Sequence, residues 1–145
     1  MWIFKTIDFL KWLIALILSV ALFLAVSFLN ATAFPFKGEK EYYLYSASSQ
    51  AQIKQAINPL EIPFICGESI SIPNPSNEFL DGVLTRYRAS IVKVEESEES
   101  GVVSYYCYSP KLKRGILIDG VFVNLHVVVK VESVVLGSPI IFGGY

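Results

Sequence analysis

The sequence predicts an α+β protein, in which an N-terminal transmembrane helix precedes a small two-layer domain. The domain is expected to be mainly an antiparallel sheet with two helices on one face. Three observations predict this class. The 25 residues between Lys11 and Lys37 carry no charge, two later segments space apolar residues as helices do, and the chain from residue 89 onward reads as successive strands. The expected order in the domain is β-α-β-α-β-β-β-β-β.

The uncharged segment is expected to anchor the chain in a lipid bilayer. A helix over residues 12–36 reaches about 37 Å, enough to cross a hydrocarbon core of about 30 Å. We therefore assign residues 1–11 to a short N-terminal tail, 12–36 to a transmembrane anchor or uncleaved signal, and 37–145 to one domain. The bilayer is thus the first expected partner.

The orientation of this anchor follows from its place in the chain. Basic residues on its two flanks are nearly balanced, so the positive-inside rule does not decide. A short tail before a first apolar segment usually stays cytoplasmic, which places domain 37–145 outside, in the cell envelope. The alternative is secretion after cleavage at Ala33, because Ala31-Thr32-Ala33 has the small-x-small form of a signal cleavage site. The 12–29 apolar run is longer than a usual signal core, which favours the uncleaved anchor.

The first half of the domain is expected to contain two strands and the first helix. The aromatic run 41–45 predicts a strand. Ser49 and Gln52 form an S-x-x-Q capping box, and apolar residues at helical spacing continue to Leu60, which predicts a short helix. Strict alternation over 68–72 predicts the second strand.

The second helix is expected over residues 79–87. Its apolar residues recur at i, i+1, i+4, i+5 and i+8, and Ser76 or Asn77 can cap its start. This stripe is wide enough to cover one face of a sheet.

The second half is expected to be a run of strands. They are predicted over residues 89–95, 102–108, 116–118, 121–131 and 134–142, the last with an interruption near Gly137-Ser138-Pro139. Asp119-Gly120 between apolar runs predicts a tight hairpin, because both central residues of that turn need positive φ. In the 121–131 strand, alternation sends Leu125 to the core face and His126 to a mostly solvated face.

The two cysteines are candidates for a disulfide. Export would permit a bridge between Cys66 and Cys107, and an even count leaves no thiol stranded. The alternative is two buried thiols that act as small apolar residues.

The sequence offers little catalytic chemistry. His126 is the only histidine, so a multi-histidine metal site is excluded, and we expect no metal, no cofactor and no catalytic residue. Cys107 and His126 could form a nucleophile and base pair, but alternation points them to opposite faces. We interpret His126 as a solvent-facing strand residue. In domain 37–145, 10 basic and 12 acidic residues leave a charge of −2, which argues against a nucleic-acid partner.

Charges and tyrosines supply the candidate contact residues. The acidic turn 95–101 and the basic turn 109–114 should lie at opposite ends of the sheet, because consecutive turns of a meander alternate between ends. Such a polar domain could face an anionic lipid surface or stack with copies of itself. We expect partner contacts at residues of the 102–108 strand and the basic turn, namely Tyr105, Tyr106, Tyr108, Lys111, Lys113 and Arg114.

Three functions are compatible with these observations. The first is a single-pass, membrane-anchored, non-enzymatic binding or assembly module of the cell envelope, with an envelope protein or a second copy as partner. The second is a secreted or envelope enzyme that uses Cys107 as nucleophile. The third is a structural spacer or oligomerisation domain.

Overall fold

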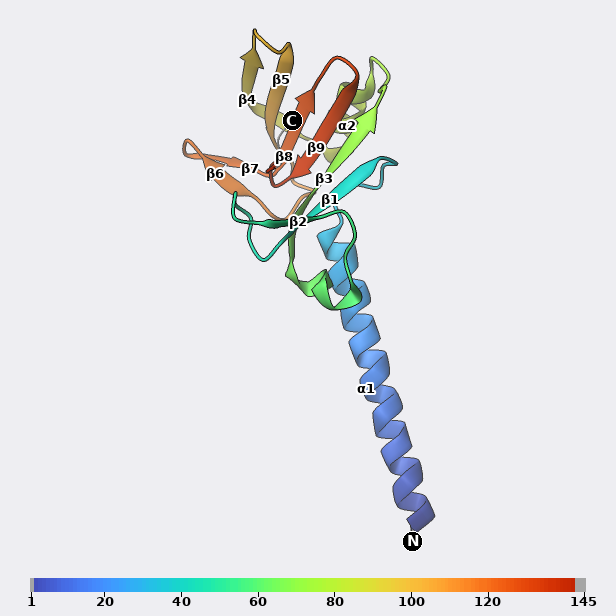
Figure 1. Cartoon of the computed structure of the whole chain (residues 1–145). Coiled ribbons are helices and arrows are strands. Elements are labelled where there is room, and N and C mark those ends of the chain that lie inside the picture. Colours follow the sequence, from blue (N-terminus) through green and yellow to red (C-terminus); the bar gives the residue numbers. More distant parts are fainter. Residues whose placement is uncertain (1, 143–145) are drawn as a thin grey trace.

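The computed structural model describes residues 2–142, without the side chains of residues 2–7, 30 and 31. Figure 1 shows a long helix, α1, that projects from a domain built around a sheet. The helical elements are α1 (Trp2–Ala31), the 3-10 helix η1 (Pro59–Phe64) and α2 (Phe79–Tyr87). The strands are β1 (Glu39–Leu44), β2 (Gln52–Lys54), β3 (Ile65–Pro73), β4 (Ser90–Ser97), β5 (Val102–Tyr108), β6 (Ile116–Ile118), β7 (Val121–Val123), β8 (Leu125–Val129) and β9 (Ser133–Ser138).

The strands form one large antiparallel sheet and one small hairpin. The large sheet has seven strands in the order β2-β1-β3-β9-β8-β5-β4, and β6 pairs with β7. The α+β class is therefore confirmed. Because β3 pairs with both β1 and β9, the first and last strands of the domain belong to one sheet.

Helix α1 is apolar along most of its length. Its stretch Asp8–Leu29 comprises 22 residues and is long and apolar enough to cross a membrane, and none of it is buried against the domain. The helix ends at Ala31, earlier than the predicted boundary at residue 36. Pro35 accounts for the difference, because a proline disfavours helical conformation in the residue before it.

The predicted helix over residues 49–60 is wrong. Residues 52–54 form β2 instead, paired with β1 so that Leu44 lies opposite Gln52. The helical turn that does form is η1, where the backbone N–H of Asn58 donates to Glu61 Oε2 at 3.0 Å. Pairing with β1 satisfies backbone groups that a short exposed helix would leave to water. One α-helix, rather than two, therefore lies against the sheet in the described residues.

Helix α2 covers the core face of the sheet, as its spacing predicted. Val83 and Tyr87 are buried from the helix side, and they pack in one apolar cluster with Ile70, Leu125 and five further buried residues, Phe34, Cys107, Val127, Val134 and Leu136. The predicted caps at Ser76 and Asn77 do not form: Glu78 is the N-cap residue and makes no side-chain cap bond. The helix is therefore held by its buried face rather than by its first turn.

The late strands agree with the prediction except in the 121–131 strand and at the end of the 134–142 strand. The Asp119-Gly120 hairpin is confirmed, with φ of 51° and 81°. The expected 121–131 strand is divided at Asn124 into β7, which pairs with β6, and β8, which joins the large sheet. The expected 134–142 strand breaks where predicted, at Ser138 before a cis peptide bond to Pro139, but it does not resume over residues 140–142.

Candidate functional site

The junction between α1 and the domain is held by a buried carboxylate. Glu68 Oε1 accepts the backbone N–H groups of Ala33 and Phe34, each at 2.6 Å. Tyr87 Oη donates to the carbonyl of Ala33 at 2.8 Å, and Lys40 Nζ donates to the carbonyl of Phe34 at 2.6 Å. The chain that follows α1 is thus bound to β3, α2 and β1, so the helix continues into the domain without a free linker.

Burial sets the electrostatics of Glu68. Removal from water raises the pKa of this carboxyl above its ordinary value, while the hydrogen bond from Phe34 and the charge of Lys40 oppose the rise. No sequence pattern singled out Glu68, because its partners are 34 and 35 residues away in the chain. A glutamate within an apolar alternating strand was the one available signal.

The basic turn between β5 and β6 lies beside the end of α1. Its residues Lys111, Lys113 and Arg114 line a hollow of about 180 Å³ together with Leu29 and Thr32 of the α1 end. The side chain of Lys111 donates to the carbonyl of Arg86, and that of Arg114 donates to the carbonyl of Ile65. These predicted contact residues are therefore gathered at one end of the domain, next to the apolar helix.

Asn124 fixes the shape of this turn, and sequence reasoning missed it. Its side chain is fully buried. Its Nδ2 donates to the carbonyls of Ser109 and Leu112 at 2.7 and 2.8 Å, and its Oδ1 accepts the N–H of Ser109 at 2.6 Å. Three hydrogen bonds from one side chain hold the loop. In the sequence, the one sign of this role was that Asn124 is an amide residue within a run of apolar strand residues.

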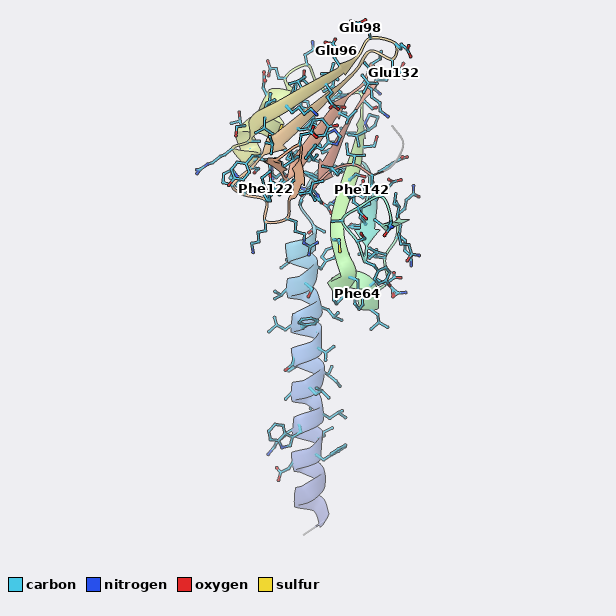
Figure 2. The ribbon with its side chains drawn as sticks, turned by 90° about the vertical axis from the view of Figure 1, so that its left-hand side faces the viewer. Phe64, Glu96, Glu98, Phe122, Glu132 and Phe142 are labelled. Carbon is cyan, nitrogen blue, oxygen red and sulfur yellow. The ribbon has the colours of Figure 1, made fainter. Side chains whose placement is uncertain are left out.

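The acidic turn lies at the other end of the domain. Figure 2 shows Glu96 and Glu98 at the end farthest from α1, beside Glu132. Lys93 pairs with Glu95 and Asp119 at 2.8 Å each, which compensates part of this charge. The predicted end-to-end separation of acidic and basic turns is confirmed.

The three predicted tyrosines do not form one surface. Tyr105 packs against the core cluster on the α2 side of the sheet. Tyr106 stacks on His126 and donates to Glu95 Oε2 at 2.9 Å. Tyr108 is 42% exposed and contacts the ring of Phe122, with centroids 6.1 Å apart. Of the three, Tyr108 is the one that offers an exposed ring.

His126 is buried, so its interpretation as a solvent-facing residue is wrong. It is 2% exposed, and its Nδ1 accepts the N–H of Ile141 at 3.3 Å. The segment after β9 covers this face of the sheet, which alternation along one strand could not reveal. Burial lowers the pKa of His126 to about 4, although the charge of Glu95 acts to raise it.

The predicted disulfide between Cys66 and Cys107 is also wrong. Both residues are free thiols. Two strands, β9 and β8, separate β3 from β5, so about 14 Å lies between the two strands, whereas a bridge needs Cα atoms within about 7 Å. Cys107 is fully buried, and burial raises the pKa of its thiol to about 11. It also faces the α2 side with Leu125, opposite to His126, as predicted.

Within residues 2–142, no group of three or more His, Cys, Asp or Glu side chains is arranged to hold a metal ion. Comparison with known proteins finds no matching family model, no matching curated protein and no matching solved structure. The candidate site is therefore defined by geometry alone: a charged turn and a buried carboxylate at the root of an exposed apolar helix.

Proposed function

We propose that the chain is a single-pass membrane protein whose α1 carries a small two-layer domain outside the cytoplasm, with the N-terminus inside. The domain acts as a non-enzymatic binding or assembly module of the cell envelope. The observation that carries the proposal is the Asp8–Leu29 stretch, a helix of 22 residues that is charge-free from Trp12 onward and contains no buried residue. Apolar surface of that extent is unfavourable in water and is covered well by lipid.

The firm junction at Glu68 supports this role. A domain held directly to its membrane helix by hydrogen bonds keeps one orientation relative to that helix, which suits presentation of a surface to a partner. The buried, protonated thiol of Cys107 lends no support to an enzyme with a cysteine nucleophile.

Membrane integration is tested with the full chain in expressing cells. We expect the chain to stay in the membrane pellet after an alkaline carbonate wash, and protease added to intact cells with a permeable outer layer to digest the domain. Recovery of the full-length chain in a supernatant without detergent would overturn the anchor. Protection of the domain from protease would overturn its outside location.

Cleavage at Ala33 is the second candidate, because an apolar helix near the N-terminus is also typical of a signal sequence. Cleavage would turn the amide nitrogen of Phe34, 2.6 Å from Glu68 Oε1, into an ammonium group and so create an ion pair with the carboxylate. N-terminal sequencing of the mature protein separates the two outcomes. Phe34 as the first residue would make the chain a secreted protein and would end the anchor proposal.

The binding surface that we propose for a protein partner is the hairpin patch, defined as Tyr108, Leu117 and Phe122. Leu117 and Phe122 lie opposite each other in the β6–β7 hairpin, and all three side chains are exposed. Phe122 is labelled in Figure 2 on the domain surface. Exposed aromatic and aliphatic side chains in one patch are typical anchors of protein interfaces.

This surface is tested by chemical cross-linking in membranes and by affinity capture from detergent extracts. Replacement of the hairpin patch by Tyr108→Ala, Leu117→Ser and Phe122→Ala is expected to lower recovery of a cross-linked partner roughly tenfold or more. The matched control Val131→Ser, at an exposed position in the β8–β9 turn, should leave recovery unchanged. Equal recovery from all chains would remove the patch from the proposal. A partner that proves to be a second copy would assign the domain to oligomerisation.

A further inference from the structure

We infer that the face of the domain around the end of α1 rests on an anionic phospholipid surface. This face, which we call the base, has two halves. Its apolar half consists of Leu60 and Phe64 of η1 together with Tyr45, whose ring packs on Phe64. Its cationic half consists of Lys111, Lys113 and Arg114 of the basic turn. The inference rests on the proposed function, because it takes α1 to span the bilayer. It adds a second contact between this chain and lipid, made by the folded domain.

The apolar half of the base extends along the helix. Helix η1 packs against α1, and Figure 2 shows Phe64 beside that helix, below the body of the domain. Leu60 is 77% exposed and Phe64 is 50% exposed. The exposed ring of Tyr45 lies 5.3 Å from that of Phe64. Aromatic and aliphatic side chains beside the end of a membrane span lie where the acyl chains meet the headgroups.

The cationic half of the base lies at the end of the same span. Lys111, Lys113 and Arg114 share one hollow with Leu29, which is the last residue of the apolar stretch. The side chains of Lys111 and Arg114 donate to backbone carbonyls, which are neutral acceptors and leave both positive charges in place. Cations beside the end of a membrane span are attracted by the anionic headgroups that surround it.

The acidic end of the domain favours the same orientation. The turn that carries Glu96 and Glu98 is at the end opposite to α1. An anionic surface attracts the base and repels this tip, so both interactions align the domain in one pose. Continuity with α1 and charge complementarity therefore point to lipid, rather than to a protein, as the occupant of the base.

The test uses the full chain in vesicles of phosphatidylcholine with or without phosphatidylglycerol. A Cys66→Ser background leaves only the buried Cys107, and an environment-sensitive fluorophore is then attached at Leu60→Cys. We expect a blue-shifted emission that is quenched by spin-labelled lipid. The matched control is Val131→Cys, which is 89% exposed and sits in the turn next to Glu132, at the far end of the domain. Its label should keep a water-like emission and escape quenching.

The native tryptophan emission separates the two proposals. Both tryptophans, Trp2 and Trp12, belong to α1. Tryptophan quenching by brominated lipid with no quenching at position 60 would overturn the base contact and keep the anchor. Absence of tryptophan quenching would overturn the anchor itself. A label at position 60 that is blue-shifted by crowding of the protein, yet is insensitive to lipid quencher, would assign the base to a second copy and overturn the lipid contact.

The cationic half has its own variant. In the unmodified chain, phosphatidylglycerol should increase the quenching at position 60. The double variant Lys111→Gln and Lys113→Gln should remove this increase, and high salt should remove it from the unmodified chain. Lys130→Gln, in the distal turn, removes a charge without touching the base and should have no effect. Quenching that is equal with and without phosphatidylglycerol in the unmodified chain would overturn the role of the cations.

Discussion

Replacement of Asn124 by alanine is expected to destabilise the domain by about 3 kcal/mol. The change removes three hydrogen bonds, two donated to the carbonyls of Ser109 and Leu112 and one accepted from the N–H of Ser109. Each such bond contributes about 1 kcal/mol, and a buried polar group left without a partner costs more. The loss should appear as a lower free energy of unfolding in denaturant titrations of the full chain in detergent.

The control for this variant is Asn77→Ala. Asn77 is exposed and caps nothing, since α2 starts without a side-chain cap bond. Its replacement should change the free energy of unfolding by less than about 0.5 kcal/mol. An Asn124→Ala chain as stable as the Asn77→Ala chain would contradict the role that we assign to the amide.

The same variant should loosen the basic turn. Without Asn124, the loop between β5 and β6 keeps the bonds from Ser109 Oγ to the carbonyl of Tyr87 and from Arg114 to the carbonyl of Ile65, but loses the three bonds that hold Ser109 and Leu112 to the strand region at residue 124. Amide hydrogen exchange at Ser109 should therefore become faster than exchange in the middle of β8. Because Lys111, Lys113 and Arg114 belong to this loop, Asn124 is a positioning residue for the base.

Acid is expected to destabilise the domain by about 3 kcal/mol through His126. Burial lowers its pKa in the folded state to about 4, compared with an ordinary value of 6.5. The folded state thus binds fewer protons than the unfolded state between these pH values. The stability that the neutral imidazole contributes is complete above about pH 6.5 and is lost as the pH falls to about 4.

Glu68 acts in the opposite direction, which the experiment has to separate. Its pKa is raised in the folded state, so stability falls as the pH rises from its ordinary value of 4.5 toward the folded value. A His126→Gln variant still contains Glu68. The difference in free energy of unfolding between this variant and the unmodified chain, measured from pH 4 to 7, therefore isolates the histidine.

That difference should change with pH by about 3 kcal/mol and be constant above about pH 6.5. Glutamine can still accept the N–H of Ile141, so the covering segment keeps a partner. A difference that is independent of pH would show that His126 is not buried in its neutral form.

The long N-terminal helix and most of the domain could be predicted because their signals are local. The charge-free run before Lys37, the spacing over residues 79–87 and the Asp119-Gly120 turn each reflect the geometry of one element. Local patterns failed over residues 49–60, where a weak helical stripe competed with a strand that β1 could pair. The structure of residues 49–60 depended on pairing with β1, which the spacing of apolar residues within the segment does not reveal.

The candidate site was predicted in part. The sequence by itself determined that a basic turn and an acidic turn would lie at opposite ends of a sheet, because turn order alone decides that. Only the tertiary structure decided that Lys113 lines the same hollow as Leu29, that Glu68 binds the start of the domain, and that His126 is covered by the segment after β9. These contacts join residues far apart in the chain, so they depend on which segments pack across the sheet, and no periodicity within one segment encodes that choice.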